Sequence, residues 1–154
     1  MKLISMLVMS LFTWIAAAAD LPYDDSADAR LEIKQALVQA GQAGVPVIVV
    51  FGANWCPDCR VLDMAIKSGA SAALMARDFK VVKVNVGRFD KNLDIAEQYG
   101  VPLKKGIPAV AILSPRNDVL YATKSGELAD ARAMGDAGIH DFLTRASVSL
   151  KSKN

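Results

Sequence analysis

Two cysteines, Cys56 and Cys59, constrain this chain more than any other feature because they directly follow an apolar segment. Residues Val45 to Phe51 are almost all β-branched or aromatic and show no polar alternation, which is typical of a strand covered on both faces in an α/β sheet. Gly52 interrupts this run. Pro57 suits the first turn of a helix, where a missing N–H costs nothing. The pattern predicts that the cysteines lie where a central strand turns into a helix.

Cysteines at this spacing lie on one face of a helix start, close enough for their sulfurs to form a disulfide. The free N–H groups and the positive end of the helix dipole favour the thiolate form of Cys56. That thiolate is a nucleophile. Cys59, one turn further along, is placed to resolve a mixed disulfide by attacking Cys56. The pair therefore predicts redox exchange with no cofactor beyond its own disulfide.

Two other uses of the cysteine pair stay open on the residues alone. Half of a zinc site would need two more ligands, and the chain offers no further cysteine and only one histidine, His140. A static structural disulfide would close a short ring and add little loop-closure entropy. Redox exchange explains the pair better than either alternative, and we expect no metal.

The composition excludes several other classes of protein. The chain has 154 residues and is 53% hydrophobic, which fits one compact domain over residues 20–154 and is too apolar for a disordered chain. Lys and Arg number 18 against 16 Asp and Glu, and like charges do not run beyond pairs such as Lys104-Lys105. We therefore expect no nucleic-acid partner.

Residues 1–19 have a different character from the rest of the chain. A single charge at Lys2 precedes an apolar stretch that runs to Ala19, and small residues at Ala17 and Ala19 suit cleavage before Asp20. This is the layout of a signal peptide. An uncleaved membrane anchor is the alternative, but the stretch is at the lower limit for a spanning helix. Export places the cysteines in an oxidising compartment, and we expect a bacterial periplasm.

The remaining chain alternates helical and strand-like segments. Helices are predicted over Ser26–Ala40 (capped by Ser26 and stopped by Gly41), from Cys56 onward, over Ser71–Phe79, from Asn92 to Tyr99 and over Asp136–Ala146. Further strands are predicted over Val81–Val86, Ala109–Leu113 and Val119–Ala122, the last two joined as a hairpin by Ser114 to Asp118. This order predicts an α/β fold with a mixed central β-sheet flanked by helices.

The sequence resembles the thioredoxin family. The segments that carry the resemblance are Val47 to Cys59, Lys83 to Val86, Tyr99 to Val101 and Gly106 to Pro108, which occur in the family's order. The Trp-Cys-x-x-Cys motif after a strand is the most specific of them. The resemblance covers roughly Leu31 to Ala146 and implies a thioredoxin-like fold with an extra N-terminal helix.

The resemblance implies a role for each residue near the motif. Cys56 is the attacking cysteine and Cys59 the resolving one. Pro108 is the family's cis-proline, and Ile107 presents its backbone to an extended substrate; an ordinary trans proline opening an edge strand is the alternative. Trp55 forms part of the substrate-facing surface, although packing against the loop would also explain it.

The residues between the cysteines are predicted to tune the redox chemistry. Asp58 is a first-turn acid, which complements the helix dipole. Its negative charge also opposes the Cys56 thiolate, which makes the dithiol a better reductant. Pro57 and Asp58 are therefore candidate redox-tuning residues.

The sequence departs from the family pattern beneath the cysteines. Many thioredoxins carry a buried acid on the central strand, where this chain has Val50, so no proton acceptor for Cys59 comes from there. Lys83 matches the lysine that accompanies this acid and is interpreted as a charge at a strand end. Asp63, Tyr99 and His140 are assigned to structure or surface.

These observations predict an exported thiol–disulfide oxidoreductase that reduces disulfides in other exported proteins. Its electrons would come from a partner, because the compartment is oxidising and the chain has no flavin or nicotinamide motif. The resemblance to exported thioredoxin-like proteins implies that this partner is a membrane thiol reductant. The alternatives are a disulfide-donating oxidase and a non-enzymatic thioredoxin-like module that holds a partner in the groove around Trp55 and Pro108. The segment from Val101 to Lys105 looks longer than in a minimal thioredoxin and would alter this groove.

Overall fold

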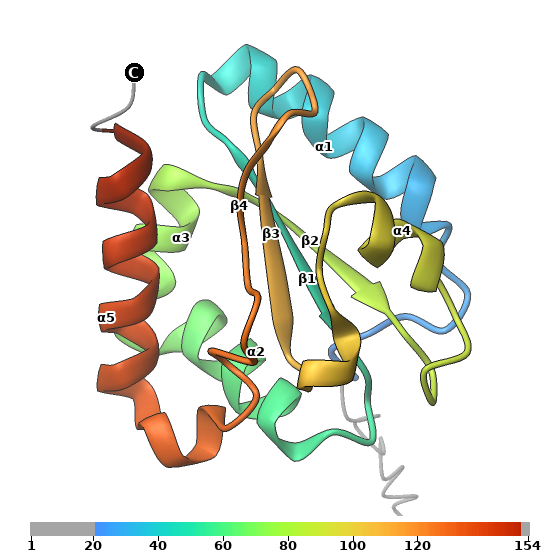
Figure 1. Cartoon of the computed structure of the whole chain (residues 1–154). Coiled ribbons are helices and arrows are strands. Elements are labelled where there is room, and N and C mark those ends of the chain that lie inside the picture. Colours follow the sequence, from blue (N-terminus) through green and yellow to red (C-terminus); the bar gives the residue numbers. More distant parts are fainter. Residues whose placement is uncertain (1–20, 152–154) are drawn as a thin grey trace, which may run out of the picture.

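The computed structural model describes residues 21–151, so the predicted signal peptide and its cleavage site lie outside the described residues. Its four strands are β1 (Val47–Gly52), β2 (Lys80–Asn85), β3 (Ala109–Leu113) and β4 (Val119–Ala122), in the sheet order β2-β1-β3-β4. Strand β1 pairs in parallel with β2 and antiparallel with β3, and β4 pairs antiparallel with β3. The predicted mixed sheet and its hairpin are thus confirmed (Figure 1).

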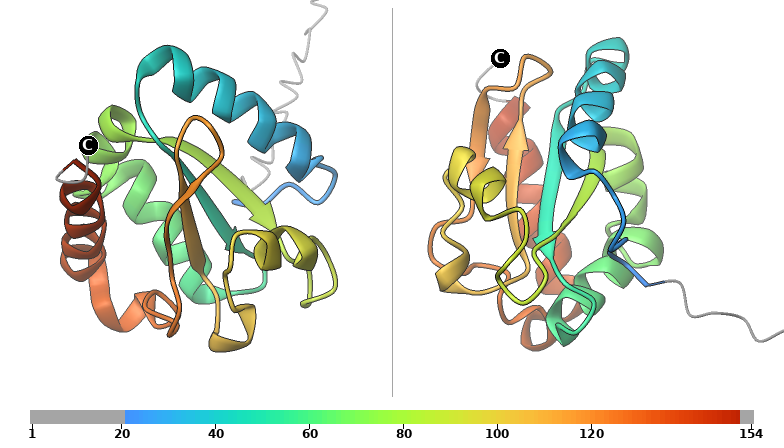
Figure 2. Two further views of the ribbon diagram at one scale, coloured as in Figure 1. Left: turned by 45° about the horizontal axis from the view of Figure 1, so that its top comes forward. Right: turned by 90° about the vertical axis from the view of Figure 1, so that its right-hand side faces the viewer.

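Helices cover both faces of this sheet. Helices α1 (Ala29–Ala43) and α4 (Leu93–Gln98) share one hydrophobic cluster with the strands, whereas α2 (Pro57–Ser68), α3 (Ala72–Asp78) and α5 (Ala131–Lys151) share another. Figure 2 shows the two helical layers from two further directions. A 3-10 turn, η1 (Leu103–Lys105), lies between α4 and β3. Every residue of β1 is buried, which explains why its sequence shows no polar alternation.

Local hydrogen bonding places the start and end of α1 differently from the prediction. The carboxylate of Asp28 accepts a hydrogen bond from the Leu31 N–H at 3.0 Å, so Asp28 is the N-cap in place of Ser26. The helix also continues past Gly41 to a C-cap at Gly44, whose φ of 67° lies in the left-handed region. The helix therefore keeps the predicted character but is shifted along the chain.

Two later helices also differ from their predicted form. Asn92 precedes α4, but with φ of 54° and no side-chain cap bond; its amide nitrogen donates to the Asn85 carbonyl at 2.8 Å and ties α4 to the end of β2. The predicted helix over Asp136–Ala146 is extended at both ends as α5, which is broken at Gly135. Within residues 21–151, no helix has the length and apolar character needed to cross a membrane.

Candidate active site

The two cysteines lie at the N-terminus of α2, directly after β1, as predicted. Cys56 is the N-cap residue, and its sulfur accepts a hydrogen bond from the Cys59 N–H at 3.2 Å. Pro57 occupies the first helical position, where its missing N–H needs no partner. Both thiols are reduced, with 4% of Cys56 and 0% of Cys59 exposed. Cys56 alone retains exposed surface, so an incoming disulfide meets it first.

The two thiols differ in pKa. The hydrogen bond from the Cys59 side chain is the largest influence on Cys56 and, against the effect of burial, lowers the pKa of Cys56 to about 7. The same hydrogen bond, followed by burial, raises the pKa of Cys59. At neutral pH a large share of Cys56 is therefore thiolate, while Cys59 keeps its proton. This difference favours Cys56 as the nucleophile.

The residues before β3 face Cys56. The Cys56 sulfur lies 3.6 Å from the carbonyl oxygen of Ile107 and donates its hydrogen bond there. The Ile107–Pro108 peptide bond is cis, as the family resemblance implied. The fold thus brings Ile107 and Pro108 to the cysteine pair, and their contact with substrate stays a prediction.

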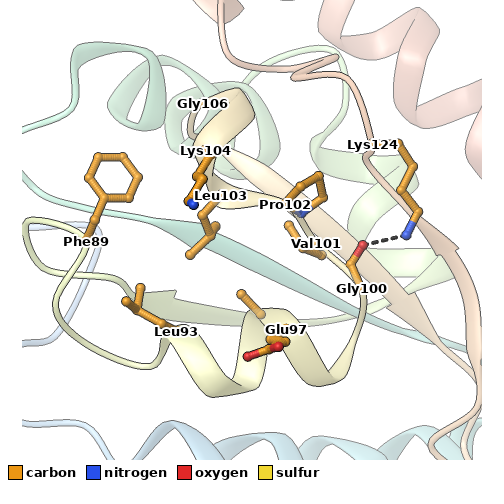
Figure 3. A pocket seen from close by; sticks show the side chains of 11 residues that line it. Phe89, Leu93, Glu97, Gly100, Val101, Pro102, Leu103, Lys104, Gly106 and Lys124 are labelled. Carbon is orange, nitrogen blue, oxygen red and sulfur yellow. Dashed lines mark hydrogen bonds between the residues drawn. The ribbon is translucent and has the colours of Figure 1, made fainter.

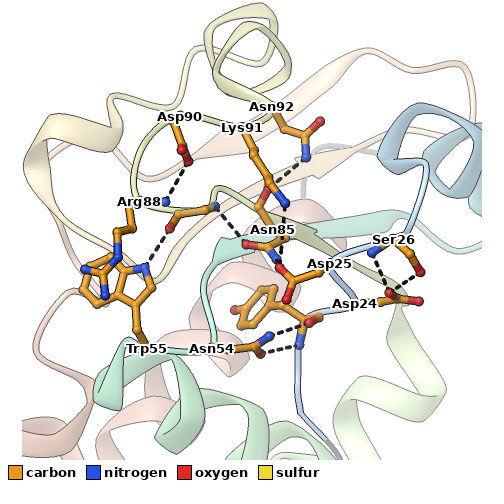
Figure 4. Close-up of polar contacts among 12 residues, drawn as sticks. Asp24, Asp25, Ser26, Asn54, Trp55, Asn85, Arg88, Asp90, Lys91 and Asn92 are labelled. Atoms are coloured by element: carbon orange, nitrogen blue, oxygen red, sulfur yellow. Dashed lines mark hydrogen bonds and ion pairs between the residues drawn. The ribbon is translucent and has the colours of Figure 1, made fainter.

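Trp55 packs against the loop after β2 and also faces solvent. Its indole N–H donates to the Gly87 carbonyl at 2.7 Å, and the Arg88 guanidinium lies 5.7 Å from the indole centroid (Figure 4). Phe89 packs edge-on against the indole, with 6.0 Å between the ring centroids. The side chain is nevertheless 43% exposed. Both interpretations of Trp55 are therefore compatible, because the loop holds the ring while part of the side chain stays exposed.

An apolar groove of about 900 Å³ lies next to this surface (Figure 3). Its walls include Phe89, Leu93, Val101, Pro102, Leu103 and Lys104. Phe89 contacts Trp55, and Gly106, which also lines the groove, immediately precedes Ile107. The segment Val101 to Lys105 therefore shapes a groove that continues the surface around the cysteine pair.

Asp58 is buried and paired with a residue that the sequence analysis did not identify. Its carboxylate accepts hydrogen bonds from the Arg132 N–H at 2.9 Å and from Arg132 Nε at 3.2 Å. Burial alone would raise the pKa of Asp58, but these hydrogen bonds outweigh it and hold that pKa below its usual value. The charge of Asp58 still acts to raise the pKa of Cys56. Arg132, near the start of α5, is therefore part of the electrostatic environment of the site.

The interpretation of Lys83 as a strand-end charge is wrong. Its ammonium nitrogen lies 2.6 Å from one carboxylate oxygen of Asp63, and Lys67 lies 3.0 Å from the other. Asp63 is 8% exposed. Helix α2 thus supplies, one turn after Cys59, a buried acid beside the lysine that the family pattern places next to an acid at Val50. The assignment of Asp63 to structure or surface missed this pairing.

Sequence reasoning also missed Tyr23, which precedes α1. Its side chain is 1% exposed, and its hydroxyl forms a hydrogen bond with the Cys59 side chain. Asn54 holds the Tyr23 backbone, accepting from its N–H at 2.9 Å and donating to its carbonyl at 2.7 Å. The available signal was Gly52, which leaves space for another side chain at the end of a buried strand.

The one histidine stands apart from the cysteine pair. His140 lies beside the hydroxyls of Ser71 and Thr144, at 3.4 Å and 3.5 Å. Among residues 21–151, no three His, Cys, Asp or Glu side chains gather in a way that could hold a metal ion.

Comparisons with known proteins show which family the chain resembles. The family model described as thioredoxin-like matches residues 28–115. A thioredoxin from Pseudomonas aeruginosa is 33% identical over 104 residues, which cover 64% of this chain and 83% of that protein. A structure described as a disulphide isomerase from Xylella fastidiosa is 47% identical, with a TM-score of 0.80, and the match covers 84% of this chain and 98% of that one.

A thioredoxin structure from Thermus thermophilus, 22% identical with a TM-score of 0.53 over 74% of this chain and 82% of that one, shares the fold. Fold and dithiol together define the class, a thiol–disulfide oxidoreductase built on the thioredoxin fold. The chain belongs to the thioredoxin-like family.

Proposed function

We propose that this protein is exported and reduces disulfides in other exported proteins. The position of Cys56 as N-cap of α2, with the Cys59 N–H donating to its sulfur at 3.2 Å, carries the direction of the reaction, because hydrogen bonding from Cys59 lowers the Cys56 pKa only to about 7. Within this fold, a reducing thioredoxin has a thiol pKa of about 7, whereas a strong oxidant has one of about 3.5 because its reduced form is stabilised. A pKa of about 7 therefore favours a reductant over the disulfide-donating oxidase.

The reaction would begin at Cys56. Its thiolate attacks one sulfur of the substrate disulfide, and the other substrate sulfur leaves with its electron pair and takes up a proton. Cys59 then loses its proton and attacks the Cys56 sulfur, which expels the second substrate sulfur. The products are a reduced substrate and the Cys56–Cys59 disulfide. Trp55 and the Ile107 backbone flank the approach to Cys56, which supports both as substrate contacts.

The oxidised protein must regain two electrons before the next turnover. We propose that a membrane thiol reductant donates them by the same exchange of one S–S bond for another, through Cys56. An oxidising compartment supplies no soluble thiol pool for this purpose, and the chain has no flavin or nicotinamide motif. The Cys56–Cys59 disulfide is then the only redox group that the cycle requires.

Two assays on the purified protein test this direction. With dithiothreitol present, the wild type should accelerate insulin reduction, and Cys56→Ser should abolish the acceleration. Equilibration with glutathione should give a reduction potential below about −230 mV, between the values of glutaredoxins and thioredoxin. A potential at or above about −180 mV would support the oxidase. Absence of turnover in the wild type would support the binding module.

Export is tested separately on the full chain. Fractionation of a Gram-negative host should recover the protein in the periplasm, and N-terminal sequencing should start at Asp20. A protein that keeps Lys2 and stays with the membrane would instead support the uncleaved anchor. Recovery in the cytoplasm would contradict export altogether.

A second candidate function is disulfide isomerisation, which the Xylella fastidiosa relative favours because its structure is described as a disulphide isomerase. A nucleophilic Cys56 can also attack a non-native disulfide and leave after the substrate has rearranged. Scrambled ribonuclease distinguishes the two. Recovery of native disulfides without loss of protein thiols favours isomerisation, whereas release of fully reduced ribonuclease favours reduction.

A further inference from the structure

The Tyr23 side chain fills the space that Gly52 leaves beside Cys59. A Cβ placed on Gly52 would lie 2.2 Å from the Tyr23 hydroxyl oxygen and 3.0 Å from the Cys59 sulfur. The Tyr23 hydroxyl and the Cys59 sulfur therefore both lie next to Gly52, the one residue of β1 without a side chain that could separate them. The two hydrogen bonds between Asn54 and the Tyr23 backbone hold the tyrosine there.

The environment of Tyr23 makes its hydroxyl a hydrogen-bond donor. Burial is the largest influence and raises the pKa of Tyr23 well above its usual value, and negative charge on Cys59, once it forms, acts in the same direction. The carboxylate of Asp63 on α2 acts in the same direction and is paired with Lys83 on β2. Cys56 contributes in the same sense. With these groups around it, the hydroxyl keeps its proton throughout the working pH range and cannot serve as a base.

We infer that the Tyr23 hydroxyl is a further catalytic group, which stabilises the thiolate of Cys59 while Cys59 resolves the mixed disulfide. In that step the Cys59 proton leaves to solvent, the Cys59 sulfur forms a bond with Cys56, and the bond between Cys56 and the substrate breaks. The departing substrate sulfur keeps the electron pair and takes up a proton. Tyr23 retains its own proton and donates a hydrogen bond to the charge that develops on Cys59.

This role would compensate for the lack of the buried acid that many thioredoxins carry at the position of Val50. The strand position beneath the cysteines carries no acid, and the buried acid one turn after Cys59, Asp63, is paired with two lysines. A neutral donor on the N-terminal segment instead contacts the resolving sulfur directly. The inference rests on thiol–disulfide exchange itself, so it stands whether the protein works as a reductant, an oxidase or an isomerase.

The test uses the reduced protein and excess 5,5′-dithiobis(2-nitrobenzoate), followed at 412 nm by stopped flow. Attack by Cys56 releases the first thionitrobenzoate, and resolution by Cys59 releases the second. In Tyr23→Phe the second release should slow about tenfold, as expected for loss of a hydrogen bond to a charged group. Its pH midpoint should rise, and the first release should stay within about twofold of the wild type.

Tyr99→Phe is the matched control, because Tyr99 is also buried and its hydroxyl donates to Asn117 at 3.0 Å, away from the cysteines. It should leave both releases unchanged. A second release in Tyr23→Phe that matches the wild type, or an equal slowing of both releases, would overturn the inference. If Tyr23→Phe fails to fold, Asn54→Ala, which frees the Tyr23 backbone, must show the same selective slowing, and its absence would overturn the inference equally.

Discussion

At the residue scale, the site depends on two chemically identical thiols in different environments. Cys56 receives hydrogen bonds from the side chain and the backbone N–H of Cys59, which lower its pKa to about 7. Cys59 is the donor in the first of these bonds and is fully buried, so its pKa is raised. One hydrogen bond therefore activates the first nucleophile and keeps the second protonated until a substrate has been captured.

This difference predicts which cysteine variant accumulates mixed disulfides. Cys59→Ala should trap substrates covalently on Cys56, whereas Cys56→Ala should trap almost none, because Cys59 has no exposed surface and retains its proton at neutral pH. Non-reducing gels and mass spectrometry of the purified variants measure the adducts. Equal trapping by the two variants would refute the assigned roles.

The ion pair between buried Asp58 and exposed Arg132 predicts opposite effects from two substitutions. Asp58→Asn removes a charge that raises the pKa of Cys56, so this pKa should fall and the reduction potential should rise by up to about 30 mV. Arg132→Gln removes the partner of Asp58, so the Cys56 pKa should rise and the potential fall. Thiolate absorbance and glutathione equilibration measure both quantities. An unchanged potential in Asp58→Asn would leave Asp58 as an ordinary first-turn acid.

At the scale of the elements, caps decide where helices begin, and α1 illustrates this. Ser26 and Asp28 both suit an N-cap by residue type. The Ser26 hydroxyl donates to Asp24, at 2.6 Å, while the carboxylate of Asp28 accepts from the Leu31 N–H. The cap that forms is therefore the one whose oxygen reaches a free helical N–H.

Alanine substitutions at Asp28 and Ser26 should show which of the two residues stabilises the start of α1. Asp28→Ala should lower the free energy of unfolding by about 1 kcal/mol, the usual value of an N-cap. Ser26→Ala should cost less than about 0.5 kcal/mol, because its hydroxyl bonds an exposed side chain. Urea unfolding of both variants measures the difference. A larger loss in Ser26→Ala than in Asp28→Ala would contradict the cap seen in the structure.

At the scale of the whole molecule, the site is assembled from segments far apart in the chain. The segment before α1 contributes Tyr23, and the β1–α2 junction contributes the cysteines. The residues just before β3 contribute Ile107 and Pro108, and α5 contributes Arg132. The redox state of the pair is therefore linked to global folding, because these contacts exist only when the sheet and both helical layers are formed.

This linkage predicts how the stability of the reduced protein depends on pH. The pKa of Cys56 is lowered from 9.0 to about 7 on folding, so its stabilisation is present above the unfolded value and is lost as the pH falls through 7. Between about pH 6 and pH 8, the free energy of unfolding should rise by about 1 kcal/mol more in the wild type than in Cys56→Ser. Urea unfolding with reductant present measures this. Identical pH dependence in both proteins would show that Cys56 titrates normally.

The local elements of this protein followed from its sequence alone. The apolar run through β1 and the Pro57 helix start predicted the junction that holds Cys56 and Cys59, and the turn residues after β3 predicted the hairpin with β4. These features depend on contacts between residues near in sequence, where periodicity, capping and turn chemistry act directly. For the same reason the errors in these elements concern their ends, as at Ser26 and Gly41.

The partners of the reactive groups depended on the tertiary structure. Tyr23 under Cys59, Arg132 on Asp58 and the pairing of Lys83 with Asp63 each join elements that are distant in the chain. No local pattern encodes such contacts, because they depend on how helices pack on the sheet and on the space that a residue such as Gly52 leaves open. The sequence by itself therefore determined the chemistry of the dithiol, and packing decided which neighbours control its protons.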